Sequence, residues 1–141
     1  MRTLAVLLLS LTFAFSALAE KKVIAPPGSS TRMFSPGMLV DGTLYVSGHI
    51  GEDPKTRAIP EKFEDEVKQC LENIGVILKE AGMTYADVVS VQVFLTDPEL
   101  FRDMNSVYNT YFKEPRPART TVAVRLASQK ARIEISVIAR K

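Results

Sequence analysis

Two charged residues near the C-terminal end of the chain have neighbours that suit them for chemistry. Arg119 follows Pro115-Arg116-Pro117-Ala118, where the prolines hold the backbone extended and out of a helix. A guanidinium at such a junction can present its planar set of donors to a carboxylate. Glu134 stands between Ile133 and Ile135, and a carboxylate in apolar surroundings is a candidate acid or base. The residues alone leave open the ordinary alternative, in which Arg119 forms a rim ion pair and Glu134 faces solvent.

The composition argues against several other kinds of site. The 141 residues include 18 Lys and Arg against 16 Asp and Glu, without a run of one sign, so we expect no nucleic-acid partner. The single histidine, His49, and the single cysteine, Cys70, cannot form a Cys/His metal cluster within one chain. The sequence contains no glycine-rich phosphate loop. We therefore expect no metal site, and we expect Cys70 to be a small buried hydrophobe on a helix.

Residues 1–19 have the pattern of a signal peptide. Arg2 supplies a positive start, residues 4–16 are almost wholly apolar, and Ala17-Leu18-Ala19 is a small-x-small cleavage site before charged residues. The apolar run is shorter than the ~20 residues of a membrane-spanning helix. We expect cleavage after Ala19 and an exported protein, periplasmic or secreted, without a membrane anchor. An uncleaved N-terminal anchor is the alternative. Residues 20–141 are then expected to form one domain.

The rest of the chain predicts the elements that must position Arg119 and Glu134. Residues 20–32 are expected to be an extended lead-in, and Asp41-Gly42 between two β-prone runs predicts a hairpin. Apolar residues at three- and four-residue spacing predict a helix from Phe63 to Ala81. The later expected elements are a strand at 89–96, a helix that starts at a capping box of Thr96 and Glu99 and buries Phe101, Met104 and Tyr108, and strands at 120–126 and 131–139.

The predicted order is ββαβαββ, a single α+β domain in which two helices cover one face of a mixed sheet. We expect the other face to be too polar for a dry core and too rich in Phe and Thr for plain solvent surface. Such a face suits contact between subunits, with clefts at the seams. The residues expected on it are Gln92, Phe94, Thr96, Arg119, Thr121, Glu134 and Ser136.

Four segments resemble the RidA (reactive intermediate deaminase) family. Tyr45-Val46-Ser47-Gly48 resembles the first hairpin of that family, and Asn105-x-x-Tyr108-x-x-x-Phe112 resembles its second helix. Pro117-Ala118-Arg119-Thr120-Thr121-Val122 and Arg132-Ile133-Glu134-Ile135 resemble its C-terminal signature. The resemblance covers essentially all of residues 20–141 in order. It implies a fold like that of a trimeric chorismate mutase and a homotrimer with a cleft at each subunit interface.

The resemblance also implies a reaction, the hydrolytic deamination of 2-imino or 2-enamino acids such as 2-iminobutanoate and 2-iminopropanoate. The arginine matching Arg119 clamps the substrate carboxylate, and the glutamate matching Glu134 positions a water that attacks the imine carbon. Ammonia leaves and a 2-oxo acid remains, without a cofactor. Further substrate-binding positions implied in this way are Phe34, Ser47, Gly48, Asn105 and Thr121.

Three positions differ from the pattern of the family. Phe34 stands where the family often has tyrosine, Thr121 where cysteine is frequent, and His49 where glutamine is common. The missing hydroxyl of Phe34 and the export signal favour a second hypothesis, a non-catalytic protein that binds a small carboxylate or another partner. A third hypothesis, ribonuclease activity, is disfavoured by the near-neutral charge, the single histidine and the lack of a metal cluster in the sequence.

Overall fold

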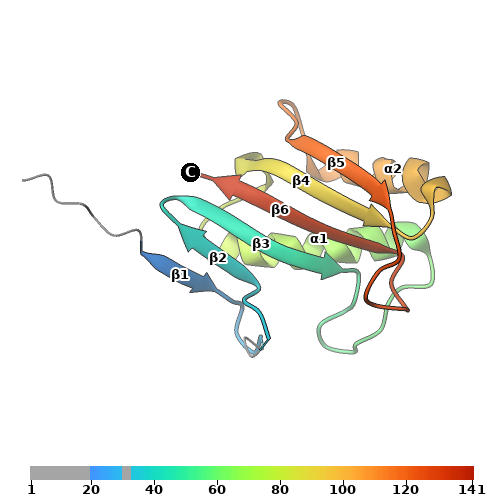
Figure 1. Ribbon diagram of the computed structural model, residues 1–141, viewed down its shortest axis with the longest axis horizontal. Helices are drawn as coiled ribbons and strands as arrows, with labels where there is room; N and C mark the ends of the chain where they lie inside the picture. The colour runs from blue at the N-terminus through green and yellow to red at the C-terminus, as the bar shows by residue number, and fades with distance from the viewer. Residues whose placement is uncertain (1–19, 30–32) are drawn as a thin grey trace, which may run out of the picture.

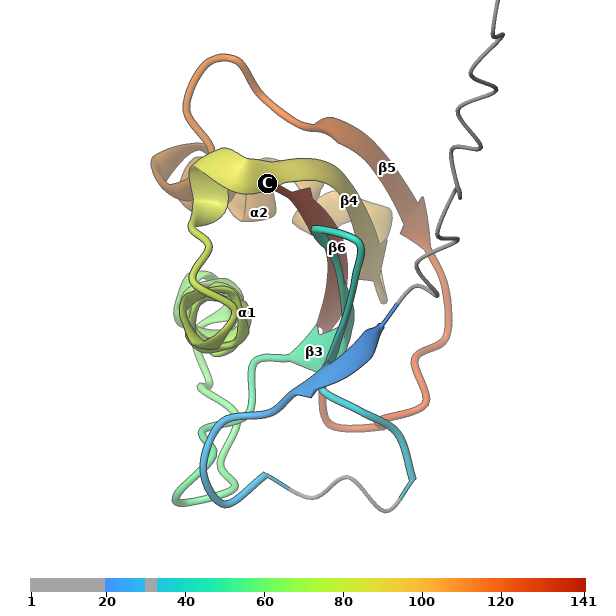
Figure 2. The same ribbon diagram turned by 90° about the vertical axis from the view of Figure 1, so that its left-hand side faces the viewer.

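A six-stranded mixed sheet is the frame of the computed structural model, which describes residues 20–29 and 33–141. The predicted signal peptide lies outside the described residues. The strands are β1 (Lys21–Ile24), β2 (Gly37–Val40), β3 (Thr43–Ile50), β4 (Val88–Leu95), β5 (Ala118–Ala123) and β6 (Ile133–Arg140). The helices are α1 (Phe63–Glu80) and α2 (Phe101–Tyr111), with single 3₁₀ turns η1 (Tyr85–Asp87) and η2 (Pro98–Leu100). Both α-helices pack on one side of the curved sheet, which confirms the predicted α+β class (Figures 1 and 2).

The predicted hairpin joins β2 and β3. Asp41 and Gly42 have φ values of 47° and 73°, the positive values that a tight two-residue hairpin turn needs, and Val40 pairs with Thr43 across it. The lead-in before this hairpin contains a strand that the sequence did not predict. That strand, β1, pairs antiparallel with β2, and Ile24 at its end is 3% exposed. Burial of this single apolar side chain stabilises the pairing of an otherwise polar segment with the sheet.

Strand β6 runs through the centre of the sheet, between β3 and β4 (Figure 1). It pairs antiparallel with both neighbours, and β5 pairs parallel with β4 at the edge. One set of alternate β6 side chains is buried in the core, and the other set is half-buried on the opposite face. Because Glu134 belongs to the second set, the alternation places it on the face that the helices leave open.

Helix α1 covers the middle of the sheet with one apolar face. The expected burial of Cys70 is confirmed, since its side chain is 0% exposed. Burial raises the pKa of the Cys70 thiol, which donates to the backbone oxygen of His49 at 3.0 Å. The first turn of the helix is acidic, as the helix dipole favours, and Gly82 follows its end at a φ of 69°.

The start of α2 differs from the prediction in two ways. The cap belongs to the 3₁₀ turn η2 that leads into α2, and it is formed by Asp97, whose Oδ1 accepts from the backbone N–H of Glu99 at 2.9 Å. The Thr96 hydroxyl is directed to the Arg132 carbonyl instead. Phe101 is 44% exposed and not buried, because the helix begins there and the ring faces the Arg119 guanidinium instead of the core. Met104 and Tyr108 are buried as predicted. None of the helices in the described residues combines the length and apolarity that crossing a bilayer requires.

Candidate active site

Arg119 is held between strand β5 and helix α2. Its Nη1 donates to Oδ1 of Asn105 at 2.8 Å, and its guanidinium carbon lies 4.5 Å from the centre of the Tyr108 ring. The Phe101 ring lies on the same guanidinium, at 5.6 Å. Two aromatic contacts and an amide partner orient the cation while most of its donors stay available for an anion. Arg119 and Asn105, two of the predicted site residues, are therefore in direct contact.

A cavity of about 510 Å³ opens beside this arginine. Its lining includes Phe101, Asn105, Tyr108, Arg116 and Arg119. Burial raises the pKa of the Tyr108 phenol, while the nearby positive charges of Arg119 and Arg116 oppose that rise. A cavity with two guanidiniums and aromatic walls suits a small anionic ligand.

Thr121 follows two residues after Arg119 on the same face of β5. Its Oγ1 is buried and has no hydrogen-bond partner among the described residues. A buried hydroxyl without a partner has a cost in free energy, so it is a reasonable place for a ligand or water to bind. This observation is consistent with the predicted role of Thr121 in the site.

Glu134 lies against bare backbone on the other side of the sheet. A Cβ atom added to Gly48 would lie only 1.9 Å from Oε1 of Glu134, so only glycine fits there while the carboxylate stays in place. The pairing of β3 with β6 shifts register between Val46 and His49, and this irregularity brings Gly48 next to the glutamate. Two predicted site residues, Gly48 and Glu134, are therefore in contact.

The remaining predicted residues lie around the same end of β3. The Ser47 hydroxyl donates to the Ser35 carbonyl at 2.7 Å and holds the incoming chain in place. Phe34, 61% exposed, lines a cavity of about 760 Å³ together with Gly48 and His49. Burial lowers the pKa of His49, and its Nε2 has no partner in the part of the chain that the structure describes. Phe34 therefore presents an apolar ring to this cavity.

The structure contradicts the prediction that Arg119, Thr121 and Glu134 share a face. Arg119 and Thr121 pair with Val91 and Val93 of β4, whose side chains point to the helices and the core. Glu134 is aligned with Phe94 of β4, on the open face. The alternation along β5 is as expected, but its register against β4 sends Arg119 to the helix side. Within one chain the structure thus divides the predicted site into an Arg119 half and a Glu134 half.

A buried ion pair that the sequence reasoning missed supports the Glu134 half. Glu66 of α1, 0% exposed, accepts hydrogen bonds from the backbone N and the Nε of Arg132, each at 2.6 Å. Arg132 also donates to the carbonyls of Pro60 and Glu61, at 2.9 and 2.8 Å. Glu66 belongs to the apolar stripe between Phe63 and Cys70, and a carboxylate in such a stripe was the available signal. The pair fixes the start of β6 close to Glu134.

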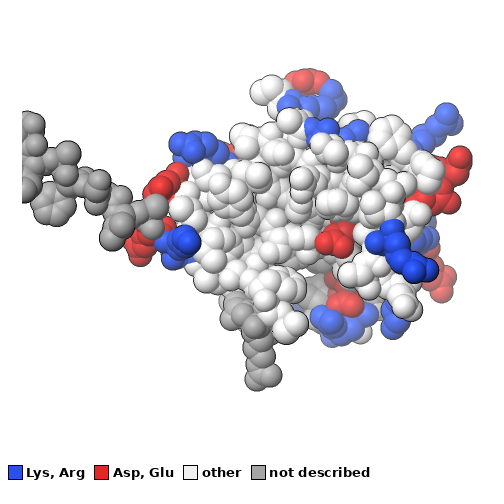
Figure 3. Space-filling view, viewed as in Figure 1, with Lys and Arg blue, Asp and Glu red and all other residues white. Residues whose placement is uncertain are grey.

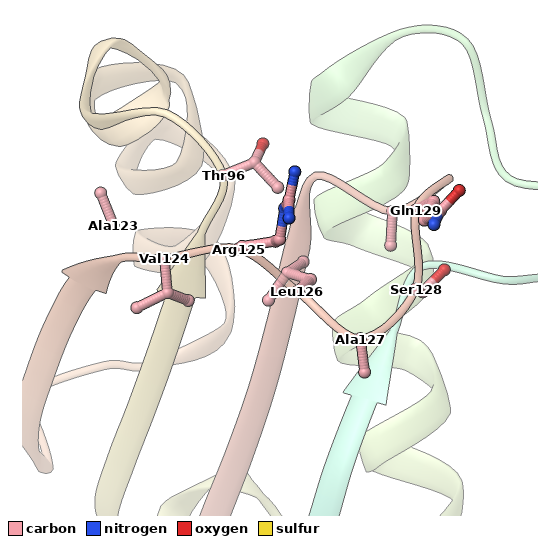
Figure 4. Close-up of a pocket in the computed structure, with 9 residues that line it drawn as sticks. Thr96, Ala123, Val124, Arg125, Leu126, Ala127, Ser128 and Gln129 are labelled. Carbon is pink, nitrogen blue, oxygen red and sulfur yellow. The ribbon is translucent and has the colours of Figure 1, made fainter.

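A third cavity, of about 850 Å³, lies where the chain passes from β5 to β6 (Figure 4). Figure 4 shows Thr96 and Arg125 extending on the same side of the connecting segment. None of the predicted site residues lines this cavity. Within residues 20–29 and 33–141, no three His, Cys, Asp or Glu side chains gather in a way that could hold a metal ion.

Comparisons with known proteins agree on one group of relatives. A family model described as Endoribonuclease L-PSP matches residues 25–141. The 2-iminobutanoate/2-iminopropanoate deaminase of Rattus norvegicus is 43% identical over 107 residues, which is 75% of this chain and 78% of that protein. The family-model match spans the whole region from the hairpin to the last strand.

Solved structures show the same fold. The Rid family protein YyfA from Yersinia pestis has a TM-score of 0.81 at 33% identity, covering 86% of this chain and 100% of that one. TdcF from E. coli, solved with bound serine, has a TM-score of 0.78 at 30% identity, covering 85% and 98%. The ligand of the latter structure is a small carboxylate.

Proposed function

This chain belongs to the RidA/YjgF family, the family of the Endoribonuclease L-PSP model, and from that premise we propose that it hydrolyses 2-imino and 2-enamino acids. The products would be a 2-oxo acid and ammonia. The observation that carries the proposal is the Arg119 guanidinium, held by Asn105 and Tyr108 at the wall of a cavity for a small anion. Relatives of about 40% identity that carry the name of this deaminase support it.

In the proposed mechanism Arg119 binds the substrate carboxylate through two parallel N–H···O bonds. Glu134 accepts a proton from a water whose oxygen attacks the imine carbon, and the C=N double bond becomes a C–N single bond. Glu134 passes that proton to the nitrogen, which gives a carbinolamine. It then takes the proton of the carbinolamine hydroxyl and delivers it to the same nitrogen, so the C–N bond breaks and ammonia leaves as the carbonyl of the 2-oxo acid forms. Water is the only co-reactant that this sequence of steps needs. By fixing the carboxylate, Arg119 holds the imine carbon close to the attacking water, and this positioning accelerates the reaction.

The two halves of the site need a second copy of the chain. Arg119 and Glu134 occupy opposite faces of one sheet, so one chain cannot bring both to one small ligand. We propose a homotrimer in which each cleft combines the Arg119 half of one subunit with the Glu134 half of its neighbour. The open face supports self-association, because Tyr45, Val122 and Val124 on and beside it are 50%, 40% and 38% exposed. Figure 3 shows that this face is largely uncharged.

Phe34 favours one alternative function. Without the tyrosine hydroxyl the Glu134 half offers one polar group fewer to a reacting imine, so a protein that only binds a small carboxylate is the second candidate. Endoribonuclease activity, which the description of the family model names, has no comparable support in the geometry of the two halves.

Steady release of 2-oxobutanoate from 2-iminobutanoate, generated in place by an amino-acid oxidase, tests the proposal. We expect acceleration over spontaneous hydrolysis, lost in Glu134→Gln and reduced more than tenfold in Arg119→Lys, because an ammonium lacks the two-pronged donor geometry. Glu80→Gln, at the exposed end of α1, is the matched control. Binding of 2-oxobutanoate without acceleration would favour the non-catalytic alternative. The absence of both binding and acceleration would refute the deaminase and the carboxylate-binding alternative. RNA cleavage by the same preparation would favour the endoribonuclease.

A further inference from the structure

The cavity beside Arg119 contains a second guanidinium that the proposed reaction does not use. Arg116 and Arg119 both line it, with Phe101, Asn105, Tyr108 and Asn109, and no acidic side chain of the described residues is part of that lining. A monocarboxylic imino acid has one negative charge, which Arg119 would neutralise. Arg116 would then remain beside the uncharged end of such a substrate.

Arg116 is available to a ligand in spite of its ion pair. Its Nη1 donates to Oε1 of Glu114, whose side chain is 73% exposed, and the side chain of Arg116 itself is 50% exposed. An ion pair between two such exposed groups contributes little. One bond to Glu114 also leaves most of the five guanidinium donors unused. A ligand carboxylate could therefore bind Arg116 beside Glu114 or in its place.

Tyr108 offers a third donor at the same cavity. The residue is only 2% exposed, and the one polar group that acts on its hydroxyl as a hydrogen-bond partner is the Arg119 guanidinium. Because a guanidinium only donates, the phenolic hydrogen has no acceptor among the described residues. The positive charges of both Arg119 and Arg116 lower the pKa of this phenol against the effect of burial, which means that both cations act on the hydroxyl. A buried donor without a partner, near two guanidiniums, is suited to a carboxylate oxygen.

We propose that the preferred substrate is a 2-imino dicarboxylic acid, with Arg119 binding the carboxylate next to the imine and Arg116, assisted by the Tyr108 hydroxyl, binding the distal one. The inference rests on the proposed function and adds the substrate class. Chains of four or five carbons, as in 2-iminosuccinate and 2-iminoglutarate, carry the two carboxylates that this arrangement needs. Hydrolysis of either gives the corresponding 2-oxo dicarboxylic acid and ammonia, with water as the only co-reactant.

Binding of the two product types to the purified full-length protein tests the substrate class. Titration calorimetry would compare 2-oxoglutarate with 2-oxobutanoate in the wild type, in Arg116→Gln and in Arg102→Gln. Arg102 is an exposed arginine of α2 that does not line the cavity, so its removal controls for general charge. We expect the wild type to bind 2-oxoglutarate about tenfold more tightly than 2-oxobutanoate, since charge-assisted hydrogen bonds are worth that much. Arg116→Gln should bind the two 2-oxo acids with similar affinity, and Arg102→Gln should keep the tenfold preference for 2-oxoglutarate.

The outcomes separate this inference from the proposed function. Binding of 2-oxobutanoate and hydrolysis of 2-iminobutanoate, with no preference for 2-oxoglutarate, would overturn the substrate class and leave the deaminase standing. A preference that is equal in Arg116→Gln and the wild type would also overturn it. Binding of neither 2-oxo acid would overturn both. Relative rates with imines generated from glutamate and from 2-aminobutyrate should follow the same order as the affinities.

Discussion

Arg119 and Glu134 leave the sheet through opposite faces, although both belong to strands of the same sheet. Arg119 is aligned with Val91 of β4 on the helix side, and Glu134 is aligned with Phe94 on the open side. A ligand that contacts both groups must therefore contact two chains. The proposed reaction therefore depends on how the subunits associate.

Mixed assemblies of two inactive variants test the shared cleft. Arg119→Ala retains Glu134 and Glu134→Gln retains Arg119, so a cleft between them can be complete. Every mixed trimer has one intact cleft in three, so mixed trimers isolated from the homotrimers are predicted to have roughly a third of the wild-type activity. Co-expressed variants with different tags, isolated by both tags, would be assayed for imine hydrolysis.

Two measurements accompany that experiment. Light scattering should give about three times the subunit mass for the wild type and for both variants. Each variant co-expressed as two differently tagged copies of itself, and carried through the same isolation, provides the baseline. Recovery no greater than this baseline, from confirmed mixed trimers, would show that the cleft does not combine Arg119 and Glu134 of neighbouring subunits.

Phe34→Tyr restores the hydroxyl that the chain lacks. Because Phe34 is 61% exposed, the free energy of unfolding should change by less than about 0.5 kcal/mol. If the hydroxyl contributes one hydrogen bond in the transition state, the deaminase rate should rise about tenfold. Met33→Tyr, which places a phenol at a neighbouring exposed position, is the control. Equal rates for Phe34→Tyr and the wild type would show that this replacement does not limit the reaction.

Glu66→Gln should destabilise the protein strongly. The carboxylate of Glu66 is 0% exposed and accepts two hydrogen bonds from Arg132, so the amide leaves a partly buried guanidinium without its counter-charge. Breaking a buried pair costs about 3–5 kcal/mol, and we expect about 3 because the Arg132 side chain is 35% exposed. Urea denaturation would measure it. Glu64→Gln, on the same turn in a looser pair with the exposed Lys62 at 3.8 Å, should cost less than about 1 kcal/mol, and a similar loss in both variants would contradict the prediction.

His49 should make stability depend on pH in the acid range. Burial lowers its pKa below the ordinary value of 6.5, so below pH 6.5 the unfolded chain takes up a proton that the folded chain resists. Stability is therefore highest above pH 6.5 with respect to this group and falls as the pH decreases from there toward the folded-state pKa. Urea midpoints at pH 7.5 and 5.5 should decrease less in His49→Gln than in the wild type. An identical decrease would assign the pH dependence to other groups.

We also expect cleavage after Ala19 when the full chain is expressed in a bacterium with its own leader. Small residues at positions 17 and 19 suit signal peptidase, and the charges that follow keep the new terminus soluble. Intact mass of the protein in the periplasm or the medium should correspond to residues 20–141. Recovery of the uncleaved chain in the membrane fraction would favour the anchor.

The sequence by itself determined the elements, because apolar periodicity records which side chains avoid water. The helix from Phe63 and the alternation along β6 were readable in this way. The turn at Asp41-Gly42 was readable from a different signal, the tolerance of these two residues for positive φ values. The short strand β1 was not readable, since it owes its place to the burial of one residue, Ile24. Resemblance further identified Arg119, Glu134, Gly48 and Asn105 as candidates, and two pairs of them are in contact.

Only the tertiary structure decided how the candidate residues are distributed. The alternation of side chains shows which β5 residues share a face, but the register of β5 against β4 decides which face of the sheet that is. A register shift of one residue would exchange the two faces. Val122 is aligned with Phe94 on the open face and is 40% exposed at the edge of the sheet, whereas Arg119 points to the helices. The pairing of Glu66 with Arg132 joins residues far apart in the chain, and no local pattern encodes such a contact. Local periodicity is set by the neighbours of each residue, whereas register and long-range pairing are set by packing of the whole sheet against its helices.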